Sequence, residues 1–336
     1  MRSNFPHLKL QVIFGLCVLL ASQGRSEESV FEENAKPQLV AEGAGEGPAW
    51  DPKLGMLFSG DGHIMRWDRA GKTSIYRENA GSNGLLFDSS GNLLICEPVR
   101  RQVSRLDREG KLAVLTDQYQ GSRYNQPNDI TVDSHGRIYF SDPCYGPCAD
   151  LEMKDEQGRK VEGVYRIDPD HKVTRIITHE VDRPNGLVVT PDDRYLYVAD
   201  NNNNTLDENK QVIGGRKLWR FDLKDAGTVD VESQKLIYDW GDSRGPDGMV
   251  LDQRGRIYVA GGLNKPNPPF ETNASKGGVY VFSPAGKLLE FVPIPRDEVT
   301  NCTFGGDDLR TLFVTAGGTL WSVRTTTPGQ MPWPKK

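Results

Sequence analysis

The chain has 336 residues, of which 26% are charged and 37% hydrophobic, with a net charge of −5. This composition is typical of a folded globular protein and excludes a disordered chain or a bundle of membrane helices. The acidic balance, without any basic tract, argues against nucleic acid or anionic lipid as a partner. The 36 Gly and 21 Pro residues favour many short strands joined by turns, so we expect an all-β chain.

The first 24 residues read as a secretory signal peptide. Arg2 and Lys9 flank an apolar run from Leu10 to Ala21, and small residues follow. The run is shorter than the ~20 residues of a spanning helix, and a retained membrane anchor is the alternative interpretation. Cleavage would change the net charge from −5 to −7, because Arg2 and Lys9 leave and no acidic residue does. We therefore expect a secreted or periplasmic protein that has no contact with the membrane after cleavage.

Six later segments share one pattern, in which a polar residue is followed by an apolar run, a turn and a second apolar run. Further strand-like runs lie between them, and most end in phrases such as RWD, RLD, RID or RFD. Four strands in each of six repeats are typical of a six-bladed β-propeller. The six segments begin at Glu46, Asn83, Asn128, Asn185, Asp247 and Asn301.

The same pattern gives the expected division of the chain. Residues 1–24 form the signal peptide, 25–35 a linker, 36–327 the propeller and 328–336 a loose C-terminal tail. A strand expected from Lys36 to Glu42 would complete the last blade and close the ring.

Four cysteines remain after cleavage: Cys96, Cys144, Cys148 and Cys302. Export permits disulfides, and the turn sequence CYGPC suits a bridge between Cys144 and Cys148, although a pair of free thiols is the alternative. A zinc site is disfavoured, because the sequence has no paired His and no second Cys pair at ligand spacing. The polar stretch from Asp150 to Glu162 is expected to be a loop on the same blade.

Every repeat begins with Glu, Asn or Asp, and the innermost strands of a propeller surround its central channel. Six such residues would direct oxygen atoms at one axis. Oxygen donors without His or Cys select Ca²⁺ or Mg²⁺ over zinc or copper, and the loose geometry of Ca²⁺ suits a ring completed by water. The alternative is that these residues only shape turns where the strands begin.

Several phrases resemble the SMP-30/gluconolactonase/luciferin-regenerating-enzyme family. They are EGPAW at 46–50, QPNDITVDSHGRIYFSDP at 126–143, GVYRID at 163–168, RPNGLVVTPDDRYLYVAD at 183–200, GPDGMVLDQRGRIYVAG at 245–261 and VTNCTFGGDDLRTLFVTA at 299–316. They occur in order over nearly the whole mature chain. The resemblance implies a six-bladed, metal-dependent lactonase or esterase.

The resemblance also implies site residues. It narrows the metal ligands to Glu46, Asn128, Asn185 and Asp247, and leaves Asn83 and Asn301 as substrate-contacting candidates. Asp129 resembles a substrate-contacting position of animal members. Those members carry Arg where this chain has Gln126, so Gln126 is a substrate-contacting candidate that departs from the family pattern.

We therefore expect hydrolysis of a sugar lactone such as glucono-1,5-lactone. A Ca²⁺ ion would polarise the carbonyl, with Zn²⁺, Mn²⁺ or Mg²⁺ as alternatives, and Asp247 would act as general base or as nucleophile. Glu46 could share that role. The sequence has no Gly-x-Ser-x-Gly motif, which disfavours a serine hydrolase. The alternatives are a non-catalytic Ca²⁺-binding propeller and a hydrolase of another ester or an organophosphate. No feature of the sequence indicates an oligomeric state.

Overall fold

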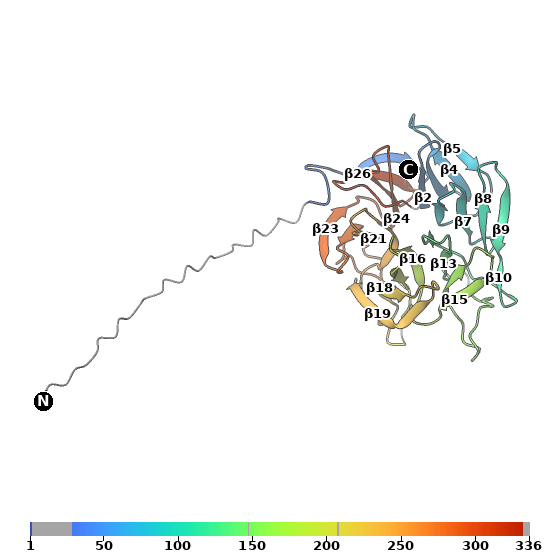
Figure 1. Ribbon diagram of the computed structural model, residues 1–336. Coiled ribbons are helices and arrows are strands. Elements are labelled where there is room, and N and C mark those ends of the chain that lie inside the picture. The colour runs from blue at the N-terminus through green and yellow to red at the C-terminus, as the bar shows by residue number, and fades with distance from the viewer. Residues whose placement is uncertain (2–28, 147, 207, 332–336) are drawn as a thin grey trace.

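The computed structural model describes residue 1 and residues 29–146, 148–206 and 208–331. Six four-stranded antiparallel sheets surround a central axis, and the chain passes once around it (Figure 1). The prediction of an all-β six-bladed propeller is therefore confirmed. Residues 2–24 of the predicted signal peptide, residues 1–24, lie outside the described residues. Within the described part, we find no helix with the length and hydropathy needed to cross a bilayer.

In each blade the first strand lies innermost and the last outermost. Blades 1 and 2 contain β2 (Glu46–Asp51), β3 (Gly55–Gly60), β4 (His63–Trp67) and β5 (Thr73–Arg77), then β6 (Leu85–Phe87), β7 (Leu93–Glu97), β8 (Gln102–Leu106) and β9 (Leu112–Thr116). Blades 3 and 4 contain β12 (Ile130–Val132), β13 (Ile138–Asp142), β14 (Gly163–Ile167) and β15 (Val173–Ile177), then β16 (Pro184–Val189), β17 (Tyr195–Asn201), β18 (Arg216–Leu223) and β19 (Val229–Asp239). Blades 5 and 6 contain β20 (Pro246–Leu251), β21 (Ile257–Gly261), β22 (Gly278–Phe282) and β23 (Leu288–Pro293), then β24 (Val299–Gly305), β25 (Thr311–Ala316), β26 (Thr319–Arg324) and β1 (Gln38–Glu42). A small hairpin, β10 (Gln118–Tyr119) and β11 (Ser122–Arg123), follows blade 2.

Local sequence explains the tight hairpins between the first two strands of a blade. In blade 2, Asp88 Oδ1 accepts hydrogen bonds from the backbone N–H groups of Ser90 and Asn92, both at 2.9 Å. Gly91 completes this turn with a φ of +75°, a conformation that glycine adopts without steric cost. The Asp-x-x-Gly phrase therefore stabilises this turn by contacts within the hairpin itself.

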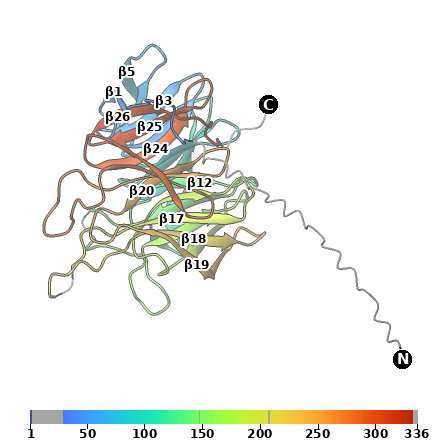
Figure 2. The same cartoon turned by 90° about the vertical axis from the view of Figure 1, so that its left-hand side faces the viewer.

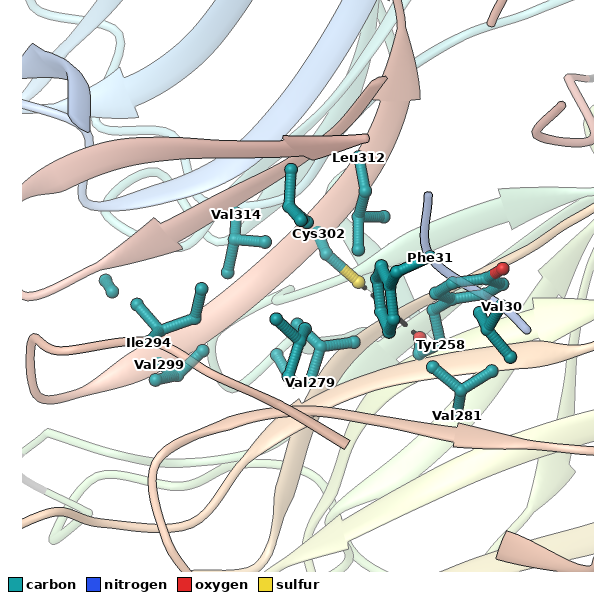
Figure 3. Close-up of a cluster of buried hydrophobic side chains, with 14 of the residues drawn as sticks. Val30, Phe31, Tyr258, Val279, Val281, Ile294, Val299, Cys302, Leu312 and Val314 are labelled. Carbon is teal, nitrogen blue, oxygen red and sulfur yellow. Dashed lines mark hydrogen bonds between the residues drawn. The ribbon is translucent and has the colours of Figure 1, made fainter. Parts of the chain in front are cut away.

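The two ends of the propeller meet in blade 6, where β1 pairs antiparallel with β26. The segment before β1 is more than a linker, because Val30 and Phe31 are buried between blades 5 and 6. Figure 3 shows Phe31 beside Tyr258 and Val30 near Val281; Tyr258 and Val281 belong to blade 5. The expectation of a linker over residues 25–35 is therefore wrong for Val30 and Phe31, which belong to the core.

The start of the C-terminal tail is also held in place. The carbonyl of Pro328 accepts from the Gln253 amide at 2.9 Å, and the Gly329 amide donates to the Leu309 carbonyl at 2.8 Å. The expectation of a loose tail is therefore wrong for Pro328 and Gly329, and residues 332–336 lie outside the described residues.

The blades pack face to face, and each strand alternates its side chains between two neighbouring interfaces. Between blades 5 and 6, Val279 and Val281 of β22 pack in one buried cluster with Cys302 and Val314 of blade 6 (Figure 3). The innermost strands β2, β6, β12, β16, β20 and β24 contact one another in a closed ring. Figure 2 shows the same propeller turned by 90°. The first residues of these six strands therefore lie at one end of the channel.

Candidate functional site

The beginnings of neighbouring innermost strands are linked by direct hydrogen bonds. Asn301 Nδ2 of blade 6 donates to Glu46 Oε2 of blade 1 at 3.0 Å. The Gly84 amide of blade 2 donates to the carbonyl of Asn128 in blade 3 at 2.7 Å. The sequence-predicted ring residues therefore come together from six separate blades: Glu46, Asn83, Asn128, Asn185, Asp247 and Asn301.

Glycine follows the ring residue in four of the six blades, and close packing between blades explains its presence. A Cβ atom at Gly186 would lie 2.1 Å from the carbonyl oxygen of Asp247. A Cβ atom at Gly248 would lie 2.0 Å from Asn301 Oδ1. Both separations are far below van der Waals contact. The absent side chains therefore let the blades approach closely at Gly47, Gly84, Gly186 and Gly248.

Three acidic side chains share this site and repel one another: Glu46, Asp129 and Asp247. Burial raises the pKa of Glu46 from 4.5 to about 7, although Gly47 N, at 2.6 Å, and Asn301 donate hydrogen bonds to its carboxylate. Burial and then the charge of Glu46 raise the pKa of Asp129 from 3.8 to about 7. The same two causes raise the pKa of Asp247 well above its usual value.

In the part of the chain that the structure describes, these carboxylates are not paired with a cation. Among the described residues, no Arg, Lys or His forms an ion pair with any of the three. Arg244 is close enough to lower the pKa of Asp247, but it binds Glu298 at 2.7 Å and also Glu271. The buried oxygens Oδ1 of Asp247 and Oδ1 of Asn83 have no hydrogen-bond partner within the described part of the chain. Unpaired buried charge and unsatisfied oxygen atoms fit a divalent cation bound by oxygen ligands.

The amides of the ring differ in which atom is already used. Asn301 donates to Glu46 through Nδ2, and its Oδ1 accepts from the Cys302 amide at 2.8 Å. Asn185 also donates through Nδ2, to Tyr145 Oη at 2.9 Å, and this leaves its carbonyl oxygen for another partner. Asn185 therefore suits a cation better than Asn301 does.

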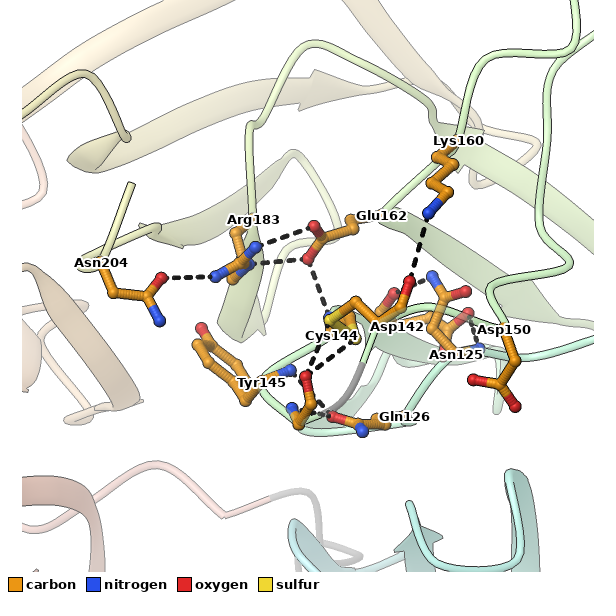
Figure 4. Close-up of a disulfide and its surroundings, with 12 residues drawn as sticks. Asn125, Gln126, Asp142, Cys144, Tyr145, Asp150, Lys160, Glu162, Arg183 and Asn204 are labelled. Atoms are coloured by element: carbon orange, nitrogen blue, oxygen red, sulfur yellow. Dashed lines mark hydrogen bonds and ion pairs between the residues drawn. A yellow bond between two sulfur atoms is a disulfide. The ribbon is translucent and has the colours of Figure 1, made fainter. Parts of the chain in front are cut away.

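A disulfide-closed loop borders the site, between β13 and β14. Cys144 and Cys148 form a disulfide, so the alternative of two free thiols is wrong. Cys96 and Cys302 are free and buried. Gln126 Oε1 accepts from Tyr145 N at 2.8 Å and from Gly146 N at 3.2 Å (Figure 4). The side chain of Gln126 thus anchors this loop.

Tyr145 is the site residue that sequence reasoning did not assign. Its hydroxyl contacts Asn185 although 40 residues separate them. The only signal was indirect, a tyrosine between two cysteines just after the QPN phrase.

A second acidic group lies away from the axis, in the turns of blades 3 and 4. Ligand atoms of Asp133, His135 and Asp193 lie within 4.8 Å of one another. However, Asp133 already pairs with Arg137 and accepts from Tyr139 Oη at 2.9 Å. Its charge is neutralised, so this group is a weaker candidate for a cation site than the axis.

Residues 44–318 match the SMP-30/Gluconolactonase/LRE-like region. A gluconolactonase of Zymomonas mobilis is 28% identical over 308 residues, which covers 84% of this chain and 79% of that protein. Regucalcin of Bos taurus is 27% identical over 295 residues, covering 86% and 85%. The solved structure of a gluconolactonase from Xanthomonas campestris superposes with a TM-score of 0.71 at 27% identity, covering 88% of this chain and 91% of that one.

Proposed function

This chain belongs to the SMP-30/gluconolactonase/LRE-like family, and on that premise we propose that it hydrolyses a sugar lactone at a divalent cation on the propeller axis. The observation that carries the proposal is a group of three carboxylates, buried Asp129 and half-buried Glu46 and Asp247, with no cation paired to them among the described residues. The named gluconolactonase relatives support a lactone as the substrate. Two other relatives, from Gallus gallus and Bos taurus, are regucalcins, and their name agrees with calcium as the cation.

The proposed ligands are Glu46, Asn128, Asn185 and Asp247. All four offer oxygen, and two are anionic, so their summed charge balances a divalent ion such as Ca²⁺. The same set accommodates Mg²⁺, Mn²⁺ or Zn²⁺ less selectively. When bound, the cation supplies Lewis-acid polarisation of the lactone carbonyl.

Asp247 is the proposed general base. Its Oδ1 is buried and has no hydrogen-bond partner among the described residues, so it can accept a proton from a water molecule beside the carbonyl. The water oxygen then adds to the carbonyl carbon, the ring C–O bond breaks, and the proton returns to the leaving ring oxygen. In the covalent variant, the carboxylate of Asp247 attacks the carbonyl carbon, the ring C–O bond breaks and the leaving ring oxygen takes a proton from water. A second water molecule then hydrolyses the resulting mixed anhydride and releases the Asp247 carboxylate. Glu46, next to it in the ring, is the other carboxylate that could share this role.

Five predicted residues are proposed to hold the substrate, and one of them, Asn128, is also a proposed cation ligand: Asn83, Gln126, Asn128, Asp129 and Asn301. Asn83 and Asp129 suit lactone hydroxyl groups, because each presents a buried oxygen at the site. Asn301 donates to Glu46 and so also helps to orient a proposed ligand.

The proposal is tested by measuring lactone hydrolysis in a pH-stat, first with the cation stripped by a chelator and then with Ca²⁺ restored. We expect turnover of glucono-1,5-lactone that disappears with the chelator and returns with Ca²⁺. Tight Ca²⁺ binding without turnover of any lactone or ester would instead favour the non-catalytic calcium-binding propeller, which the regucalcin relatives make the second candidate. Turnover of only another ester or an organophosphate would change the proposed substrate class but leave the proposed active site unchanged.

We also propose that the protein is exported, by means of the predicted signal peptide of residues 1–24. The disulfide between Cys144 and Cys148 supports this, because such bonds persist in oxidising compartments. Intact mass measurement of the protein recovered outside the cytoplasm should show a chain that begins near residue 25.

A further inference from the structure

The loop that carries Tyr145 is fixed at several points on blade 3. The disulfide joins its ends at Cys144 and Cys148. Cys144 N donates to Glu162 Oε2 at 2.8 Å, and Tyr145 N donates to Gln126 Oε1 at 2.8 Å (Figure 4). The backbone of Tyr145 is thereby held in one place relative to blade 3.

The side chain of Tyr145 crosses to blade 4. Its ring lies 5.4 Å from the guanidinium carbon of Arg183, which in turn binds Glu162 at 2.8 Å (Figure 4). Its hydroxyl donates to the carbonyl of Asn201 at 3.1 Å and accepts from Asn185 Nδ2 at 2.9 Å. Although 41% of the residue is exposed, the hydroxyl is directed at two groups of the neighbouring blade.

This chain of hydrogen bonds determines which end of the Asn185 amide faces the tyrosine. The carbonyl oxygen of Asn201 can only accept, so the Tyr145 hydroxyl must donate its single proton to it. It can then only accept from Asn185, and only the NH₂ end of that amide can donate. The carbonyl oxygen of Asn185 is consequently turned away from the tyrosine.

We propose that Tyr145 is a positioning residue that fixes the Asn185 amide with its carbonyl oxygen available to ligate the cation. This inference rests on the assignment of Asn185 as a ligand in the proposed function. Without the hydroxyl, the amide is free to rotate and present NH₂, which cannot ligate a cation. The closed loop of blade 3 thus controls a ligand on blade 4.

Tyr145→Phe tests the proposal, because it keeps the ring and removes only the hydroxyl. Binding of Ca²⁺ to the chelator-stripped protein, measured by calorimetry, should weaken by about 10- to 100-fold, as for other partners that orient metal ligands. At saturating Ca²⁺, kcat should return to near the wild-type value, because Tyr145 acts through Asn185. Tyr76→Phe, on the outer strand of blade 1, is the matched control and should leave the affinity unchanged.

A double-mutant cycle separates orientation of the amide from a general effect on the loop. A carboxylate offers oxygen whichever way it turns, so in an Asn185→Asp background the change Tyr145→Phe should alter Ca²⁺ affinity by less than about twofold. An unchanged affinity in the single variant would overturn the proposal, as would an equal loss in both backgrounds.

The outcomes remain distinct from those of the proposed function. Tight Ca²⁺ binding that depends on the Tyr145 hydroxyl, without turnover of any lactone, would sustain this inference and refute the lactonase. Lactone turnover together with a Ca²⁺ affinity that does not change in Tyr145→Phe would support the lactonase and refute this inference.

Discussion

The carboxylates in the turns of blades 3 and 5 differ from those at the axis in whether an arginine neutralises them. The turns share the phrase Asp-x-x-Gly-Arg-Ile-Tyr, beginning at Asp133 and Asp252. In blade 5, Asp252 pairs with Arg256 and accepts from Tyr258 Oη at 3.1 Å. Asp133 in blade 3 has the same arrangement with its own Arg and Tyr.

At the axis, Glu46, Asp129 and Asp247 have no such arginine among the described residues. A buried acid with a structural role in a turn is therefore neutralised by an arginine. Where acids are left unpaired, their charge is free for a ligand. The following variants would break or sharpen this contrast.

The largest effect is expected from Asp247→Asn. Loss of the proposed base should lower kcat by about 10²- to 10⁴-fold, while the fold persists because the amide has nearly the shape of the carboxylate. Lactone hydrolysis in a pH-stat and circular dichroism measure the two quantities. Asp117→Asn, at an exposed position, is the control and should keep full activity. Wild-type turnover in Asp247→Asn would remove Asp247 from the chemistry.

The matched change in the turn, Asp252→Asn, should act on stability instead. It leaves the buried guanidinium of Arg256 without a counter-charge, which costs about 3–5 kcal/mol when one partner of a buried pair is removed. Urea denaturation measures this loss, and kcat of the folded fraction should stay near the wild-type value. A stable but inactive variant would contradict the division between structural and functional acids.

The pH dependence of stability should differ between cation-free and Ca²⁺-bound protein. In the folded, cation-free state the pKa of Glu46 is raised from 4.5 to about 7, and that of Asp129 from 3.8 to about 7. The folded state then binds more protons than the unfolded state in this window, so the contribution of these two groups to stability falls as pH rises from about 4 to about 7 and is constant above that. For Glu46 alone the loss is on the order of 3 kcal/mol.

A series of thermal melts from pH 4 to pH 8, with chelator or with Ca²⁺, checks this prediction. Ca²⁺ favours the ionised carboxylates, so its stabilising effect should be larger at pH 7 than at pH 5. Glu46→Gln should remove the contribution of Glu46 to the pH dependence of stability. The dependence that remains in this variant comes from other buried acids, such as Asp142, whose pKa is raised to about 8. A chelated protein that gains stability through this window would show that the axis acids are already compensated.

The smallest effect is expected from Gly186→Ala. Its Cβ would lie 2.1 Å from the Asp247 carbonyl oxygen, so the blades must separate, at a cost of about 1–3 kcal/mol. Ca²⁺ affinity should fall with it, because Asn185 and Asp247 flank the contact. Gly136→Ala is the control: its φ of +75° strains the turn, but nothing lies within 4 Å, so Ca²⁺ affinity should not change. Equal effects of both variants on Ca²⁺ affinity would contradict a tightly packed ring.

Much of this protein follows from the sequence by itself. Strand alternation, the Asp-x-x-Gly turns and the six repeats are local patterns, so they gave the propeller and aligned Glu46 with the five later ring residues. The same repeat placed glycine after most ring residues, although the sequence did not explain it. Close approach of neighbouring blades, for example at Gly248, supplies the reason.

Only the tertiary structure decided which groups meet across blades. The hydrogen bond from Asn185 to Tyr145 and the burial of Phe31 in the core each depend on residues far apart in the chain. So does the pairing of Arg244 with Glu271 and Glu298 rather than with Asp247. No spacing rule encodes such contacts, because they arise only when the six blades close into a ring and bring distant side chains within hydrogen-bonding distance.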